Sequence, residues 1–248
     1  EFEQMEMQFF VRPGNEMKWY NYWKDLRMKW HNSLAMGEGN YRFHDHENLA
    51  HYANAATDIE FKFPFGFKEL EGIHSRTDFD LKAHQKHSGK KLQYFDPEIQ
   101  KSYIPYVIET SIGLDRMFLA VLSHSFREEE LPNGESRVVL KIPAVLAPIK
   151  VAVLPLTKKD HLPEKAREIL KLLQVEFNCQ YEEKDSIGKR YRRQDSIGTP
   201  FCVTVDHQSL EDNTITLRDR DTMNQKRVSI KKLSSIILKK VSIVNYLA

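Results

Sequence analysis

Hydrophobic and polar positions alternate with a period of two along residues 106–113, YVIETSIG. This period predicts a β-strand, because successive side chains of a strand point to opposite faces. One face of the strand would be small and polar, formed by Val107, Glu109, Ser111 and Gly113. From Leu114 to Leu122 the apolar residues recur at helical spacing instead, so a buried helix should follow the strand directly.

Arg116 falls in the first turn of that predicted helix. The N–H groups of a first helical turn favour anions, so a cation there suggests that something negative binds beside it. A phosphate is the expected ligand. The residues alone leave a second interpretation open, in which Arg116 pairs with Asp115 or Glu109 at a domain edge.

Further segments complete the pattern of the first half. Residues 2–9, 59–65 and 67–73 alternate like strands, the last two separated by Gly66, and aromatic residues recur at helical spacing over residues 19–30. The lysine-rich segment 77–103 is predicted to be a loop or hairpin over the site, with a solvated face favoured over RNA contact. The first half therefore predicts antiparallel strands with helices on one side.

Two predicted strand faces carry chemistry that could bind a small molecule. The first face could stack a base and hold an amine, and it consists of Phe2, Gln4, Glu6 and Gln8. The second lies near Arg76 and could recognise a zwitterion, and it consists of Phe67, Glu69, Glu71 and Ile73. An exposed sheet face and a structural ion-pair network are the respective alternatives.

His44, His46 and His51 do not have the spacing of a metal site, and His51 is predicted to lie on a short helix. No zinc is expected.

The second half predicts a small α/β domain. Residues 150–156, KVAVLPL, form a continuous apolar run, which is typical of a strand buried on both faces. A helix should begin near Pro163, and a last amphipathic helix should cover residues 231–240. Further strands are expected at residues 175–181, 201–206, 214–217 and 227–230.

Basic residues surround an aromatic ring between two copies of the sequence DSIG, at 185–188 and 195–198. Positive charge beside a ring suits single-stranded RNA, because the charge neutralises phosphates and the ring stacks on a base. RNA binding is favoured here over a solvated face. The predicted contacts are Lys189, Arg190, Tyr191, Arg192 and Arg193, and a second basic strip adds Arg218, Arg220, Lys226 and Arg227.

Composition limits the class of protein without identifying it. The chain has 248 residues, 41% hydrophobic and 29% charged, as in soluble globular proteins, and its net charge of +2 does not by itself indicate nucleic acid. No apolar run is long enough to cross a membrane, and we expect a cytoplasmic protein without membrane partners. Because residue 1 falls inside an alternating strand, the sequence is expected to be part of a longer chain.

Taken together, five stretches resemble glycyl-tRNA synthetases of the homodimeric type, which are class II aminoacyl-tRNA synthetases. EFEQMEMQFF is similar to the second half of motif 2 of that class, and YVIETSIGLDRMFLAVL is similar to motif 3. AHYANAATDIEF and FKELEGIHSRTDFDL resemble the glycine-specific stretches between these motifs. LAPIKVAVLPL with IGKRYRRQDSIGTPFCVTVD resembles the anticodon-binding domain.

The resemblance implies an α+β fold, in which an incomplete antiparallel class II catalytic sheet (1–148) precedes a small mixed-sheet α/β anticodon-binding domain (149–248). It implies that glycine is activated with ATP and Mg²⁺ to glycyl-adenylate and then transferred to tRNA(Gly), by a homodimer in the full-length protein.

The resemblance also assigns site residues. Phe2 would stack on adenine, and Arg116 would hold the γ-phosphate. Glu109 would lie near the metal-bound phosphates or the glycine amino group, as a catalytic residue and Mg²⁺ ligand. The glycine-binding residues would be Glu6, Glu69, Arg76 and Ser111.

Motif 1 and the arginine of motif 2 are absent, so we expect these 248 residues alone to be inactive in adenylation. Two other function classes stay open. One is a non-catalytic relative such as the accessory subunit of the mitochondrial DNA polymerase, and the other is a free-standing RNA-binding module.

Overall fold

The computed structural model describes residues 3–132 and 134–244. The chain forms two compact units, residues 1–123 and 124–248, each of which is described by itself. None of the helices in the described part of the chain is long and apolar enough to cross a membrane.

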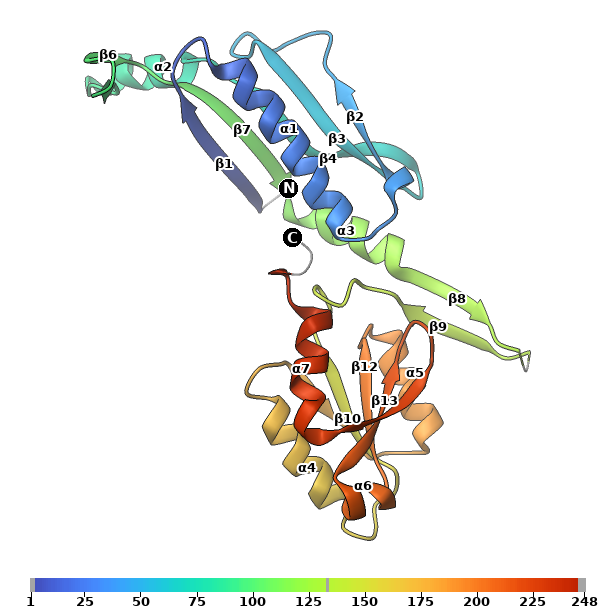
Figure 1. Cartoon of the computed structure of the whole chain (residues 1–248). Helices are drawn as coiled ribbons and strands as arrows, with labels where there is room; N and C mark the ends of the chain where they lie inside the picture. Colours follow the sequence, from blue (N-terminus) through green and yellow to red (C-terminus); the bar gives the residue numbers. More distant parts are fainter. Residues whose placement is uncertain (1–2, 133, 245–248) are drawn as a thin grey trace. The chain divides into compact units, whose positions relative to one another are not determined.

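The first unit is built on a five-stranded antiparallel sheet, which confirms the predicted antiparallel arrangement (Figure 1). The strand order is β1-β7-β4-β3-β2, so the first strand pairs with the last one of the unit. The strands are β1 (Gln4–Val11), β2 (Tyr41–Asp45), β3 (Ala55–Phe63), β4 (Gly66–Ser75) and β7 (Tyr106–Gly113).

Helix α1 (Glu16–Ser33) covers one face of this sheet (Figure 1). Tyr20 is buried in the core, and Trp19, Trp23 and Trp30 pack partly against it, as expected for an aromatic stripe used in packing. A short 3₁₀ helix, η1 (Glu38–Asn40), leads into β2. Helix α3 (Leu114–Ser125) follows β7 without a loop, as the change of period predicted.

The segment 77–103 contains a helix that the sequence did not predict. It forms α2 (Phe79–Ser88) and then a hairpin of β5 (Tyr94–Asp96) and β6 (Lys101–Tyr103). No residue of α2 is fully buried, so its sequence lacks the apolar stripe that would have indicated a helix. The predicted short helix at His51 was wrong, because residues 46–54 form turns and bends.

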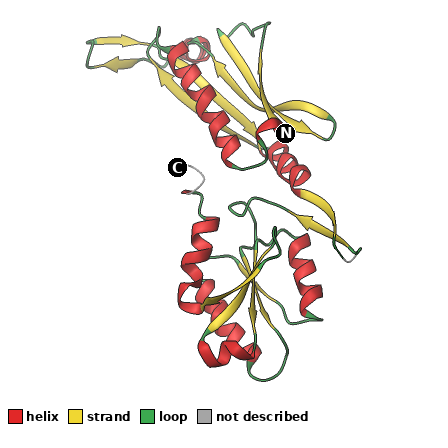
Figure 2. Cartoon of the chain, turned by 45° about the vertical axis from the view of Figure 1, so that its right-hand side comes forward, coloured by secondary structure: helices red, strands yellow, loops and turns green. Residues whose placement is uncertain are grey.

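The second unit is built on a mixed sheet of order β11-β10-β12-β13-β14, with helices on both sides (Figure 2). Strands β10 (Val151–Pro155), β11 (Cys179–Tyr181) and β12 (Phe201–Val205) are parallel, while β13 (Thr214–Asp219) and β14 (Gln225–Ser229) are antiparallel. The helices are α4 (Leu162–Leu173), α5 (Ile187–Ser196), α6 (His207–Asp212) and α7 (Ile230–Val241).

Strand β10 is buried on both faces, as its continuous apolar sequence predicted. Val151 and Val153 belong to the larger core, whereas Ala152 and Leu154 pack with Cys202 on the other side of the sheet. The two faces of β10 thus contribute to two hydrophobic clusters, one on each side of the sheet.

A hairpin of β8 (Phe126–Glu130) and β9 (Ser136–Leu140) also belongs to the second unit. Arg137 on β9 is 1% exposed, and its Nη1 lies 3.1 Å from the buried carboxylate of Asp195 on α5. This buried ion pair explains why the compact unit begins earlier in the chain than residue 149. The boundary predicted at 148/149 divides the expected catalytic part from the expected anticodon-binding part, and it stays a prediction.

Candidate functional site

The register of the first sheet brings polar side chains together on the face opposite α1. Glu109 on β7 is paired with Gln8 on β1 and with His74 on β4. Its neighbours Ile108 and Ile112 point the other way, into the core under α1. The amide of Gln8 donates to Glu109 Oε2, and Arg76 Nη1 donates to Glu109 Oε1 at 2.8 Å.

Glu109 is held ionised by these contacts. Burial alone would raise its pKa, but contacts with His74, Gln8 and Arg76 outweigh burial and lower the pKa to about 2. His74 Nδ1 lies 3.7 Å from Glu109 Oε1, which is too long for a hydrogen bond. The carboxylate is therefore negative throughout the neutral range.

The neighbouring row of the sheet places Glu6 opposite Ser111, which in turn lies opposite Gly72. Glu6 is exposed and Ser111 is partly exposed, so both can be reached from solution. A Cβ atom on Gly72 would lie 2.9 Å from His74 Cε1. The absence of a side chain at residue 72 thus leaves the room that the His74 ring occupies.

Arg76 joins this cluster from the end of β4, but it is already held by two carboxylates. Its Nε donates to Asp80 at 2.9 Å, in addition to the bond to Glu109, and its guanidinium lies over the ring of Tyr52, 4.3 Å from the centroid. The structure thus brings Glu6, Ser111, Glu109 and Arg76 to one face.

The expectation that Glu69 and Glu71 share a face was wrong. The register between β3 and β4 shifts at Ile59/Glu60, so that Leu70 and Glu71 are both buried, each 1% exposed. Glu71 accepts hydrogen bonds from Arg27 at 2.6 Å and from His31 at 2.7 Å, both on α1. Glu69 instead has a side chain that is 51% exposed.

Arg116, in the first turn of α3, meets Glu69. Its Nη1 lies 3.1 Å from Glu69 Oε2 and donates to the Glu69 carbonyl oxygen at 3.2 Å. Among the residues that the structure describes, Arg116 is paired with Glu69 rather than with Asp115 or Glu109, the two that the sequence left open. The Arg116 side chain is 46% exposed, so part of it can be reached from solution.

Two predicted roles need separate comment. Phe2 lies outside the described residues, so its stacking on adenine stays a prediction. The assignment of Glu109 as a Mg²⁺ ligand also stays a prediction; its two oxygens accept bonds from Arg76 and Gln8, and the residue is 7% exposed.

Within residues 3–132 and 134–244 there is no group of three or more His, Cys, Asp or Glu side chains that could hold a metal ion. Among the predicted histidines, His46 is hydrogen-bonded to Asp58 at 2.8 Å, and the rings of His44 and His46 are 5.7 Å apart.

In the second unit, three of the arginines assigned to RNA are buried. Arg190, Arg218 and Arg220 are 2%, 5% and 2% exposed. Arg190 donates to the carbonyl oxygens of residues 155, 156 and 182, and Arg220 donates to that of Gly198. Arg218 forms two hydrogen bonds with Asp195, at 2.7 and 2.9 Å. Their assignment to RNA is corrected, because these guanidinium groups are buried and bonded to acceptors inside the protein.

Tyr191 is also engaged within the protein. Its hydroxyl is hydrogen-bonded to Thr204 at 2.6 Å, and the Arg218 guanidinium lies over its ring at 4.7 Å.

The remaining basic residues of α5 are more accessible. Lys189 is exposed, and the side chains of Arg192 and Arg193 are 39% and 41% exposed. Arg193 pairs with Glu182 and Asp185, and Arg192 Nη2 lies 3.7 Å from Glu135. A basic surface therefore exists on α5, but it is narrower than the sequence indicated.

Sequence reasoning missed Gln8 and His74 as partners of Glu109. The polar alternation of the first strand did place Gln8 on the correct face. Nothing in the sequence, however, showed that this strand pairs with residues 106–113.

Comparison with known proteins covers both units. Residues 150–240 match the family model described as "Anticodon binding domain". The glycine–tRNA ligase of Chlorobaculum tepidum is 51% identical over 97% of this chain and 51% of its own length. The ligases of Ruminiclostridium cellulolyticum and Clostridium tetani are 53% and 51% identical, over 95% and 97% of this chain.

The chain spans about half the length of the curated relatives it matches, with 51%, 51% and 52% of these three covered. Over nearly its whole length the chain is therefore similar to glycine–tRNA ligases and carries an anticodon-binding domain, which confirms the resemblance to glycyl-tRNA synthetases expected from its motifs.

Proposed function

We propose that this chain is part of a glycine–tRNA ligase, which activates glycine with ATP to glycyl-adenylate and transfers the glycyl group to tRNA(Gly). The observation that carries the proposal is the 51% identity to such a ligase over 97% of the chain, across both units. In this proposal residues 1–148 are the C-terminal portion of a class II catalytic core, and residues 149–248 bind the anticodon.

Adenylate formation requires placement and charge stabilisation rather than a covalent nucleophile. A carboxylate oxygen of glycine attacks the α-phosphate of ATP, and pyrophosphate leaves. Arg116 is suited to the γ-phosphate because its side chain is 46% exposed and its acidic partner Glu69 is 51% exposed. A triphosphate carries more negative charge than one carboxylate, so it can replace Glu69 as the partner of the Arg116 guanidinium.

The glycine ammonium would bind the carboxylates of the polar face. Glu109 is ionised, and Glu6 and Ser111 lie in the adjacent row of the sheet. Arg76 can receive the glycine carboxylate by releasing Asp80, whose side chain is 36% exposed, while it keeps its bond to the buried Glu109. Glycine offers no side chain to grip, so specificity would come from a pocket without room for a β-carbon.

Several parts of this proposal concern the whole protein. Mg²⁺ would enter with ATP and neutralise phosphate charge. Stacking of adenine on Phe2, homodimer formation and a cytoplasmic location belong to the same proposal.

The test is glycine-dependent exchange between pyrophosphate and ATP in the full-length protein. Arg116→Ala should lower the exchange rate about 100-fold to 1000-fold, because a cation that stabilises developing phosphate charge is lost. The matched control is Arg42→Ala, since Arg42 has a 54% exposed side chain paired with Glu60 on the same sheet. Absence of glycine-dependent exchange in the unmodified full-length protein would favour a non-catalytic nucleic-acid-binding protein. Exchange that is unchanged by Arg116→Ala, or equally reduced by Arg42→Ala, would overturn the role of Arg116 at the γ-phosphate.

A further inference from the structure

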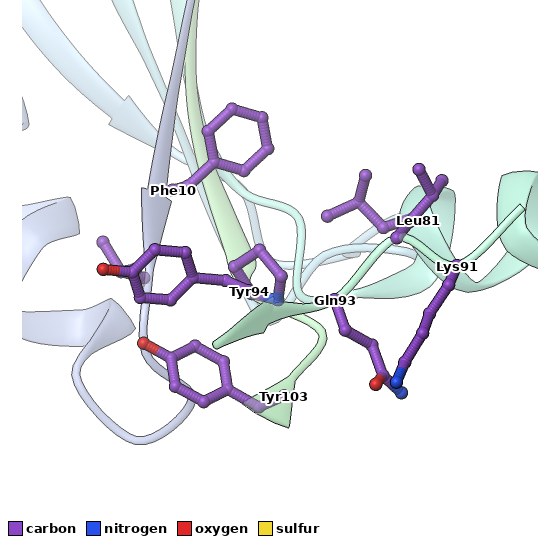
Figure 3. Close-up of a pocket in the computed structure, with 9 residues that line it drawn as sticks. Phe10, Leu81, Lys91, Gln93, Tyr94 and Tyr103 are labelled. Carbon is purple, nitrogen blue, oxygen red and sulfur yellow. The ribbon is translucent and has the colours of Figure 1, made fainter. Parts of the chain in front are cut away.

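A cavity of about 590 Å³ lies in the first unit, outside the polar face around Glu109. It forms where the end of β1, helix α2 and the β5–β6 hairpin meet (Figure 3). The rings of Phe10, Tyr94 and Tyr103 lie on one side, and Leu81, Lys91 and Gln93 lie on the other. Val11, Leu92 and Pro105 complete the lining.

The aromatic side of this cavity is unusually exposed. Phe10 and Tyr94 are 56% and 53% exposed, although burial of such rings is favourable by roughly 1.5–3 kcal/mol each. Tyr103 meets Tyr94 at an angle of 63° with the ring centroids 5.9 Å apart, so an edge contact leaves ring faces accessible. Accessible ring faces beside a cavity suit a flat aromatic ligand.

The charge around the cavity favours a ligand that is also negative. Lys91 is the charged side chain in the lining of the cavity; the neighbouring segment also carries Lys86, Lys90 and Lys101, while Lys82 is paired with Asp78. Asp96 is mostly buried and is shared by the Tyr103 hydroxyl at 3.3 Å and Arg12 at 4.0 Å. Lys91 lines the cavity itself, where its ammonium could neutralise a phosphate.

The position of the cavity relates it to the polar face. Phe10 and Gln8 are two residues apart on β1, so they point to the same face about 7 Å apart. Gln8 is bonded to Glu109, beside which the glycine would lie. A nucleotide stacked on Phe10 would therefore lie close to the glycine.

We propose that this cavity binds one unpaired nucleotide in the single-stranded 3′ end of the tRNA, near the terminal nucleotide that receives glycine. The base stacks on Tyr94 and Phe10, the Gln93 amide bonds to the base edge, and Lys91 contacts a phosphate. This inference rests on the proposed function, since it requires a tRNA whose 3′ end reaches the polar face.

The test is fluorescence anisotropy with the complete 248-residue chain and two RNA hairpins. One hairpin carries a four-nucleotide single-stranded 3′ overhang, and the other is the same hairpin with a blunt end. Tyr94→Ala should weaken binding of the overhang hairpin about fivefold to a hundredfold, because one stacked base is lost, and should leave the blunt hairpin unchanged. Tyr94→Phe keeps the ring and should bind as the unmodified chain does.

Two further variants separate stacking from charge. Lys91→Ala should weaken overhang binding and reduce the slope of log K against log salt by about one. Phe65→Ala is the matched control, because Phe65 is 64% exposed in the first unit and does not line the cavity. If Tyr94→Ala does not fold, as judged by circular dichroism, Phe10→Ser on the same wall answers the same question.

Three outcomes would overturn the proposal. These are no preference of the unmodified chain for the overhang, equal losses for both hairpins with Tyr94→Ala, and displacement of the overhang hairpin by low concentrations of free AMP, which would indicate a mononucleotide site. Failure of the proposed function is distinguishable, because it shows as absent glycine-dependent pyrophosphate exchange in the full-length protein while overhang preference is unaffected.

Discussion

Glu109 illustrates how single residues of this face depend on one another. It is 7% exposed, yet it remains charged because Gln8 and Arg76 donate to its two oxygens. Removal of either donor would leave a buried carboxylate with an unsatisfied oxygen. The same bonds fix its orientation, which is what a residue that receives an ammonium group requires.

A dependence of stability on pH follows from the lowered pKa of Glu109. The pKa falls from 4.5 to about 2 on folding, so the stabilisation is complete above pH 4.5 and is lost as the pH falls toward 2. We expect Glu109 to contribute about 1–3 kcal/mol to the pH-dependent part of the free energy of unfolding. Urea unfolding at pH 7 and pH 3 measures this quantity.

Glu109→Gln should show a smaller loss of stability between those two pH values than the unmodified chain. Glu6→Gln, at an exposed position in the adjacent row, serves as the control and should leave the loss unchanged. The same pH dependence in Glu109→Gln and the unmodified chain would contradict the assignment.

Residue patterns identified the polar face but not the partners of each charge. Glu109 and Ser111 were placed on one face correctly because alternation alone determines the face of a strand, whereas Glu6 was placed with them only through the resemblance to the synthetases. Arg190 and Arg218 looked like RNA contacts because a run of basic residues does not show which charges are paired inside. Their acceptors are carbonyl oxygens around residue 155 and the carboxylate of Asp195, which only the folded chain brings near.

At the scale of elements, α1 is joined to the sheet by a buried ion pair. Glu71 on β4 contacts Arg27 and His31, and the side chains of Glu71 and His31 are fully buried. Burial lowers the pKa of His31 although Glu71 opposes this, and His31 Nδ1 has no hydrogen-bond partner. His31 is therefore neutral, with its hydrogen on Nε2, where it donates to Glu71.

Loss of this buried ion pair should lower the free energy of unfolding far more than loss of an exposed ion pair. Glu71→Ala leaves Arg27 and His31 without their acceptor, so we expect the free energy of unfolding to fall by about 3–5 kcal/mol. Glu60→Ala removes the partner of Arg42, whose side chain is 54% exposed, and should cost less than about 1 kcal/mol. Urea denaturation followed by tryptophan fluorescence measures both, and similar losses in the two variants would disprove the argument.

Helices whose buried face is apolar were predictable from the sequence, and helices whose buried face is polar were not. Helix α4 was found because its inward residues include Ile169 and Leu173. Helix α5 was missed because its buried residues are Arg190, Gln194 and Asp195, which are buried by pairing rather than by hydrophobicity. A hydrophobic pattern cannot show a helix of that kind.

At the scale of the whole molecule, the chain consists of two units with separate cores. The second unit includes the β8–β9 hairpin, because Arg137 on β9 pairs with Asp195 and also donates to the carbonyl oxygen of residue 220. Residues 150–240 match the anticodon-binding family model, and this match begins after the hairpin. The compact unit and the matched family therefore have different starting points.

This difference predicts the stability of two shorter chains. Residues 149–248 lack Arg137, so Asp195 would keep only part of its charge compensation. We expect residues 124–248 to exceed residues 149–248 in free energy of unfolding by about 2–3 kcal/mol, as measured by urea titration. Arg137→Ala in residues 124–248 should reproduce most of the loss, whereas equal stability of the two chains would show that the hairpin is dispensable.

The irregularity at Leu70 has a consequence for protein engineering. One additional residue in β4 sends Glu69 outward and Glu71 inward, although a regular strand would turn both the same way. If this segment were grafted onto a regular sheet, either Glu69 would be buried or Glu71, which binds α1, would be exposed. The local kink must therefore be transplanted together with its sequence.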